Sequence, residues 1–259
     1  MRRGFVLVAT LFAMAGCGGT PPASTSSPAL TGSITVLAAS SLTTPFTVIA
    51  RDFEKAHPGT AVHLSFAGSS TLVAQIQQGA VADVMASADQ PNMQRLVDAG
   101  LVEGTPRVFA KNRLQIVVRA GNPRHISGLQ DLARPGLVLV LCAPAVPCGS
   151  YAAQALQRAG VGVKAASQEA DVKSVLSKVS LGEADAGIVY VTDVKAAGGL
   201  EGVDIPDRFN VVASYPIAVL KESTDVPLAQ AFVAYILNGV SNAKADGQQT
   251  LRAYGFLAP

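Results

Sequence analysis

The chain of 259 residues is 49% hydrophobic and 15% charged, and it carries a formal net charge of +2. This composition can bury an ample core, as one large domain or as two small ones. So weak a charge, without a run of lysine and arginine in the body of the chain, argues against a nucleic-acid partner. Tryptophan is absent and aromatic residues make up only 5% of the chain, so a sugar-stacking platform is not expected either.

The N-terminus has the pattern of a signal peptide over residues 1–16. Two arginines precede an apolar stretch, Phe5 to Met14, and small residues then lead to Cys17. The apolar stretch is too short for a good membrane span. A cysteine directly after small residues resembles the bacterial lipobox, so we expect cleavage before Cys17 and a lipid on its sulfur. A signal peptide that is cut elsewhere is the alternative.

Residues 17–32 would form the lipidated N-terminus and a flexible tether. Serine, proline, threonine and glycine dominate this stretch, and such a composition cannot build a core. Cleavage also removes Arg2 and Arg3, so the exported body is formally neutral apart from its histidines. We therefore expect an exported protein, anchored to the outer face of the cell membrane by the lipid on Cys17.

The first half of the body alternates short β-branched runs with segments of helical periodicity. A strand is expected at 34–37, and the helix after it is marked by apolar residues at spacings of four, three and four, namely Leu42, Phe46, Ile49 and Phe53. His57-Pro58-Gly59 ends this helix. The other elements expected here are strands at 62–66 and 84–85 and helices at 69–78 and from 89 to about 100.

The second half continues the alternation. Strands are expected at 114–118, 137–141, 186–190 and 211–220, and helices at 151–159, 172–179 and 228–237. Strands that alternate with helices are typical of βαβ units. The sequence therefore predicts an α/β fold with parallel strands.

Two of the strand-to-helix junctions carry small hydroxyl residues. Ser40-Ser41 follows the first strand, and Gly68-Ser69-Ser70-Thr71 follows the second. The first N–H groups of a helix have no partner within the helix, and the helix dipole favours an anion there. Two such ends could converge on one small oxyanion. Ordinary N-capping by the serine side chains is the alternative.

Other chemistries find little support. A serine hydrolase needs a base beside its nucleophile, and the chain offers only His57, His63 and His125, without a Gly-x-Ser-x-Gly motif. Neither the spacing of metal ligands nor a nucleotide-binding glycine pattern occurs. We expect a protein that is not an enzyme and that has no cofactor. An exported hydrolase using Ser41 or Ser69 is the weaker alternative.

Several stretches resemble the molybdate-binding proteins of bacterial ABC importers, in order and at compatible spacing. They run from about Ser33 to Gly255 and read "ITVLAASSLTTPF", "FAGSSTLVAQIQQGAVADVMASADQ", "GSYAAQAL", "EADVKSVLSKVSLGEADAGIVYVTD" and "YPIAVL". The resemblance implies a periplasmic-binding-protein fold, with two α/β lobes, two chain crossovers and a ligand cleft between the lobes. Lobe 1 would comprise 33–110 plus 214–259, and lobe 2 would comprise 111–213.

The resemblance also implies a set of ligand-binding residues. Backbone N–H and hydroxyl groups of Ser41 and Ser69, the N–H groups of Cys148 and Val172, and the phenol of Tyr190 would hold molybdate as an oxyanion, with no direct protein–metal ligand. At Cys148 the family commonly has alanine or another small residue. A set of neutral donors offsets the lost hydration of a dianion without a salt bridge. A protonated phosphate would lack an acceptor in such a site.

The implied function is the capture of molybdate, and of tungstate, for delivery to the membrane permease of an ABC importer. The protein would act as a monomer. A binding protein for sulfate or another oxyanion is the alternative within the same class.

Cys142 and Cys148 form a candidate disulfide. If Cys17 is lipidated, these two cysteines are the ones that remain, and an exported protein sits where disulfides persist. The loop between them contains two prolines and could return its ends to bridging distance. A bridge across so short a loop would shape the loop more than it would stabilise the fold. Two unpaired thiols are the alternative.

Overall fold

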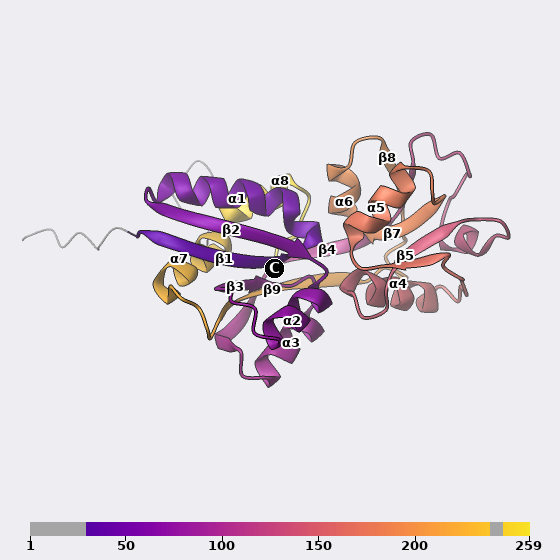
Figure 1. The fold of residues 1–259 in the computed structure, drawn as a ribbon. Coiled ribbons are helices and arrows are strands. Elements are labelled where there is room, and N and C mark those ends of the chain that lie inside the picture. Colours follow the sequence, from indigo (N-terminus) through magenta and orange to yellow (C-terminus); the bar gives the residue numbers. More distant parts are fainter. Residues whose placement is uncertain (1–29, 239–245) are drawn as a thin grey trace, which may run out of the picture.

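The computed structural model describes residues 30–238 and 246–259, which fold into two α/β lobes (Figure 1). The predicted signal peptide, Cys17 and most of the tether lie outside the described residues. A sheet of nine strands passes through both lobes in the order β2-β1-β3-β9-β4-β7-β5-β6, with β8 paired to β4. Among the helices of the described ranges, none has the length and apolar character needed to cross a membrane.

Lobe 1 contains the first three strands and the last one. Its strands are β1 (Gly32–Ala39), β2 (Thr60–Ala67), β3 (Val84–Ala86) and β9 (Val212–Leu220). The first three pair in parallel, and β9 pairs antiparallel to β3. The helices of this lobe are α1 (Thr43–Ala56), α2 (Ser69–Gln77), α3 (Gln90–Asp98), α7 (Val226–Asn238) and α8 (Gly247–Ala253), and the 3-10 turn η1 (Ser40–Leu42) precedes α1.

The sheet of lobe 1 is covered on both faces, as its alternating side chains require. Val36 and Ala38 of β1 join the core under α1, α7 and α8, whereas Leu37 between them joins a second cluster with residues of α2 and α3. In the first core the ring of Phe53 packs edge-on against Phe232, with 5.3 Å between the ring centroids. The apolar face predicted for α1 is therefore confirmed.

Lobe 2 holds the remaining elements. Its strands are β4 (Val102–Arg119), β5 (Leu139–Cys142), β6 (Ser167–Glu169), β7 (Ala186–Tyr190) and β8 (Leu200–Asp204). The helices are α4 (Pro147–Arg158), α5 (Val172–Ser180) and α6 (Val191–Ala196), and η2 (Leu129–Ala133) is a 3-10 turn. Figure 1 shows α4 on one side of the strands and α5 and α6 on the other.

Two strands, β4 and β9, connect the lobes (Figure 1). Residues 102–113 of β4 pair with β9, and residues 114–118 pair with β7 of lobe 2. The expected lobe boundaries fall on these two strands, where Lys111 lies opposite Ser214. The fold class predicted from the resemblance is confirmed. The division into 33–110 plus 214–259 and 111–213 stays a prediction at the level of single residues.

Several elements differ from the sequence prediction. Strand β4 is much longer than the predicted 114–118. The sequence prediction missed its first part, because two irregularities in the pairing with β9 break the alternation of side chains that marks a strand. Helix α4 begins at Pro147 rather than at residue 151, as the preference for proline in the first helical turn allows. The elements β6, β8, α6 and α8 were not predicted, since none exceeds seven residues.

Candidate functional site

The five residues implied by the resemblance lie around one small cavity between the lobes. Ser41, Ser69, Cys148, Val172 and Tyr190 all line it, together with Ala39, Ser40, Gly68, Ala88, Val146 and Pro147. Each of the five is at most 5% exposed. The cavity measures about 10 Å³, close to the space that a single water molecule needs. The structure thus brings all five together, from both lobes, in a closed arrangement.

The topology explains why these residues meet. Ser41 and Ser69 follow β1 and β2, which are parallel neighbours whose ends, Ala39 and Ala67, are paired. Cys148 and Val172 begin the helices after β5 and β6, which are also parallel neighbours. Tyr190 ends β7. Carboxyl ends of parallel strands meet at one edge of a sheet, where open α/β folds bind their ligands.

Side-chain N-capping, the alternative for the two serines, is not observed. The N-cap of α1 is Leu42 and that of α2 is Gly68, and neither makes a capping hydrogen bond through its side chain. The Ser41 hydroxyl instead lies 3.1 Å from the hydroxyl of Tyr215. Neither serine hydroxyl is therefore used as the side-chain cap of α1 or α2.

The Ser69 hydroxyl is held from the side of its own lobe. Its oxygen accepts a hydrogen bond from the backbone N–H of Ala88 at 3.0 Å. Because an amide N–H can only donate, the hydrogen of Ser69 is left for another acceptor.

The Tyr190 hydroxyl is a buried donor that has no partner among the described residues. The side chain is 1% exposed, and its oxygen makes no hydrogen bond with the described residues. Burial, reinforced by the nearby Tyr215 and Tyr151, raises the pKa of Tyr190 well above 10. The phenol therefore keeps its proton at neutral pH. Buried polar groups nearly always have a partner, so this one points to a ligand.

Asp193 fixes the backbone at Tyr190. Its Oδ2 accepts the Tyr190 N–H at 3.2 Å, and Lys173 Nζ lies 3.7 Å from Oδ1, an ion-pair distance rather than a hydrogen bond. Burial raises the pKa of Asp193 to about 6, although Lys173 and the Tyr190 N–H act in the opposite direction. The carboxylate is not among the residues that line the cavity.

Cys142 and Cys148 form a disulfide, with 5.8 Å between their Cα atoms. The prediction is confirmed, and the alternative of two unpaired thiols is wrong. The bridge ties the end of β5 to the first turn of α4. Gly149 allows this close approach, because a Cβ at that position would collide with the carbonyl oxygens of Cys142 and Ala143. Loop and helix start are thus held together at the cavity wall.

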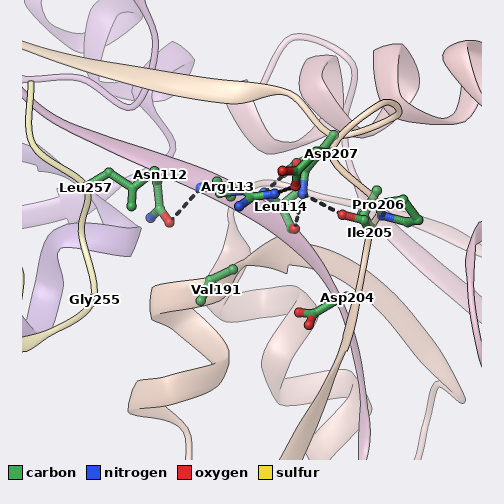
Figure 2. Close-up of a pocket in the computed structure, with 11 residues that line it drawn as sticks. Asn112, Arg113, Leu114, Val191, Asp204, Ile205, Pro206, Asp207, Gly255 and Leu257 are labelled. Carbon is green, nitrogen blue, oxygen red and sulfur yellow. Dashed lines mark hydrogen bonds and ion pairs between the residues drawn. The ribbon is translucent and has the colours of Figure 1, made fainter.

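A larger cavity, of about 450 Å³, lies where β4 enters lobe 2 (Figure 2). Arg113 and Asp207 form an ion pair across it, and the backbone N–H of Leu114 donates to Asn210. None of the five predicted residues lines it. Its one lining cation among the described residues, Arg113, is paired with Asp207.

Metal and hydrolase chemistry find no support in the described ranges. They contain no group of histidine, cysteine, aspartate and glutamate that could hold a metal ion. The three histidines, all described, do not line the small cavity. Among the described residues, no histidine therefore lines the cavity that holds the two serine hydroxyls.

Sequence reasoning missed the residues behind the cavity wall. Tyr215 and Asn112 contact Ser41 or each other from β9 and β4, and Ala88, which lines the cavity itself, contacts Ser69 from a loop inside one of the stretches that carry the resemblance. Tyr215 lies within the stretch "YPIAVL" that carries part of the resemblance, but that stretch indicated no role for it. Gly68 lies in "AGSS", where its small size was the available signal that the backbone is approached closely.

The fold and the site define an extracellular solute-binding protein. Residues 34–257 match the family of bacterial extracellular solute-binding proteins, and the chain belongs to this family. It is similar to the molybdate-binding protein ModA of Mycobacterium tuberculosis (strain H37Rv), with 43% identity across 98% of this chain and 95% of the relative. The corresponding Escherichia coli (strain K12) protein is 35% identical, across 87% of this chain and 89% of the relative.

Solved structures share the fold. The periplasmic molybdate-binding protein of Azotobacter vinelandii superposes with a TM-score of 0.74 at 21% identity, covering 87% of this chain and 99% of that one. The sulfate-binding protein SubI of Mycobacterium tuberculosis gives a TM-score of 0.73 at 22% identity, covering 86% of each chain. At these identities the likeness concerns the fold and not the ligand.

Proposed function

We propose that this protein captures molybdate outside the cell membrane and delivers it to an ABC importer, with tungstate as a second ligand. The relatives named molybdate-binding protein, at 43% and 35% identity, support this ligand. The oxyanion would accept hydrogen bonds from the groups at Ser41, Ser69, Cys148, Val172 and Tyr190. The metal atom would have no direct bond to the protein.

The unpartnered hydroxyl of Tyr190 is the observation that carries the proposal. A buried donor without an acceptor costs about 1–3 kcal/mol, and this one lines a cavity at which α2, α4 and α5 begin. Helix N-termini favour anions. An oxyanion would supply the missing acceptor and would also meet the free N–H groups of these helices.

The charge of the cavity wall favours a fully deprotonated anion. No lysine or arginine is among the residues that line it, so every donor is neutral. Oriented N–H and O–H groups can replace the hydration of a dianion. A hydrogen phosphate carries a proton that needs an acceptor, and the backbone N–H groups of this set can only donate, which disfavours it.

Sulfate remains the second candidate, because it is also a deprotonated tetrahedral dianion. The fold shared with a sulfate-binding protein keeps this alternative open. Discrimination between sulfate and the larger molybdate would rest on the size of the cavity that the lobes form around the bound anion. The hydrolase alternative is not favoured, since the family consists of solute-binding proteins and the serines contact a tyrosine and a backbone N–H.

The cellular setting follows from the same family. An extracellular solute-binding protein of an ABC importer works with a membrane permease, to which this chain would release its ligand. We propose that a lipid on Cys17 keeps it at the outer face of the membrane as a monomer. No cofactor besides the transported oxyanion is required.

Thermal unfolding of the mature protein with four anions tests this proposal. A ligand that binds only the folded state at 100 times its Kd adds about 2.7 kcal/mol, which is roughly 5–10 °C for a chain of this size. We expect this shift with molybdate and tungstate and little change with equimolar sulfate or phosphate. A shift with sulfate alone would reassign the ligand, and no shift with any of the four would overturn the oxyanion site.

A further inference from the structure

The hydroxyl of Ser41 is the first member of a chain of three hydrogen-bonded side chains, Ser41, Tyr215 and Asn112. Ser41 Oγ lies 3.1 Å from the hydroxyl oxygen of Tyr215, and Asn112 Nδ2 lies 3.5 Å from that same oxygen. Asn112 is on β4 and Tyr215 is on β9, the two strands that connect the lobes. Tyr215 is fully buried and Asn112 is 1% exposed, so water does not compete for these contacts.

The amide of Asn112 has one possible orientation. Its Oδ1 accepts the backbone N–H of Arg113 at 2.9 Å, and an N–H can only donate, so this atom is the oxygen. The Nδ2 group therefore faces the other way, where it donates to Thr192 Oγ1 at 2.8 Å and to the Tyr215 oxygen.

The direction of the next hydrogen bond follows from this orientation. The Tyr215 oxygen receives a hydrogen from Asn112, and Ser41 Oγ is the acceptor that the described residues offer to its own hydrogen. Burial raises the pKa of Tyr215 well above 10, so the phenol retains that hydrogen. The 3.1 Å contact by itself allows either hydroxyl to donate; donation by Tyr215 is the arrangement that gives its hydrogen an acceptor, and it leaves the hydrogen of Ser41 to point at the cavity.

The Ser69 hydroxyl is also left with a hydrogen to donate, through a different contact. There the backbone N–H of Ala88 donates to the serine oxygen at 3.0 Å. Both serines of the cavity therefore have an oxygen that already accepts from the protein. Each has one hydrogen left to donate to a ligand.

We propose that Tyr215 is a positioning residue that, with Asn112 behind it, sets the Ser41 hydroxyl as a donor toward the bound oxyanion. This inference rests on the proposed oxyanion site and deepens it. A ligand that carries its own proton would gain from Ser41 as an acceptor, and the donation from Tyr215 to Ser41 opposes that role. Tyr215 thereby contributes to selectivity for deprotonated anions without touching them.

A double-mutant cycle between Tyr215 and Ser41 tests the proposal. Tyr215→Phe keeps the ring, whose centroid lies 5.8 Å from that of Tyr190, and removes only the hydroxyl. We expect molybdate binding, measured by isothermal titration calorimetry, to weaken about 5- to 30-fold. In a Ser41→Ala background the same change should cost no further affinity, because the hydroxyl that it orients is gone.

The control is Tyr235→Phe, at a buried tyrosine of α7 that packs on Phe53 and does not line the cavity. It should leave affinity unchanged. An equal loss from Tyr215→Phe with and without Ser41 would overturn the inference and leave a packing role. If the variant does not fold, Asn112→Ala takes its place in the same cycle, with the same criterion. Absence of oxyanion binding to the unsubstituted protein would instead refute the proposed function.

Discussion

Tyr190 is a residue whose hydroxyl affects folding and binding in opposite directions. In the folded protein the group is buried without an acceptor among the described residues. Removing it therefore removes a desolvation cost rather than a hydrogen bond. The rest of the ring, which packs against Tyr215, would be retained by phenylalanine.

We predict that Tyr190→Phe stabilises the ligand-free protein by about 1 kcal/mol and weakens molybdate binding about tenfold or more. Denaturant unfolding measures the first effect, and calorimetric titration measures the second. Opposite signs are expected because the hydroxyl has a partner only when the anion is bound. A loss of stability without ligand would indicate that this hydroxyl serves the fold, contrary to the proposed role.

At the scale of elements, the start of α2 lies directly against lobe 2. A Cβ built on Gly68 would collide with the carbonyl oxygen of Ala170, and it would also come within 3.5 Å of Val146. The backbone of Gly68 is extended, with φ −61° and ψ 140°, which any residue can adopt. Glycine is thus required here for the close approach of the lobes rather than for the fold of lobe 1.

We predict that Gly68→Ala folds normally, at a cost below about 1 kcal/mol, but cannot close fully. Molybdate affinity should fall at least tenfold, and the ligand-induced compaction of wild-type protein, followed by small-angle X-ray scattering, should be reduced. Gly162→Ala is the matched control, because a Cβ there meets no atom within 4 Å. Wild-type affinity and compaction in Gly68→Ala would contradict a role in closure.

At the scale of the whole molecule, the two connecting strands are the segments about which we expect the lobes to move relative to each other. A cavity of about 10 Å³ is too small to admit a tetrahedral anion while it stays closed, so entry requires the lobes to separate. Hinge motion about a few residues of connecting segments is common among binding proteins of this kind. The disulfide at Cys142 and Cys148 lies within lobe 2 and would move with it.

The proposed lipid on Cys17 would decide where this molecule works. If Cys17 carries the lipid, Cys17→Ser should move the protein from the membrane fraction to the soluble extracytoplasmic fraction, since a polypeptide without the acyl chains loses its apolar anchor. Immunoblots of fractionated cells measure this distribution. Molybdate affinity of the purified variant should be unchanged. Retention in the membrane fraction would contradict anchoring through Cys17.

The sequence by itself determined the α/β class and most of the strands and helices through periodicity, and its short motifs carried the resemblance to the family, because both signals are local. It also placed Ser41 and Ser69 at helix starts, where unpaired N–H groups favour an anion. The resemblance added Cys148, Val172 and Tyr190. The structure brings these five to one cavity, while their role as ligands stays a prediction.

Only the tertiary structure decided what stands behind the cavity wall. Tyr215 is 174 residues from Ser41 and 103 from Asn112 along the chain, so no local pattern connects them. The collision expected between a Cβ at Gly68 and Ala170 likewise depends on how two lobes approach. Hydrogen-bond direction and interlobe contact arise from distances in space, and a sequence pattern, which reports on neighbours along the chain, carries no record of them.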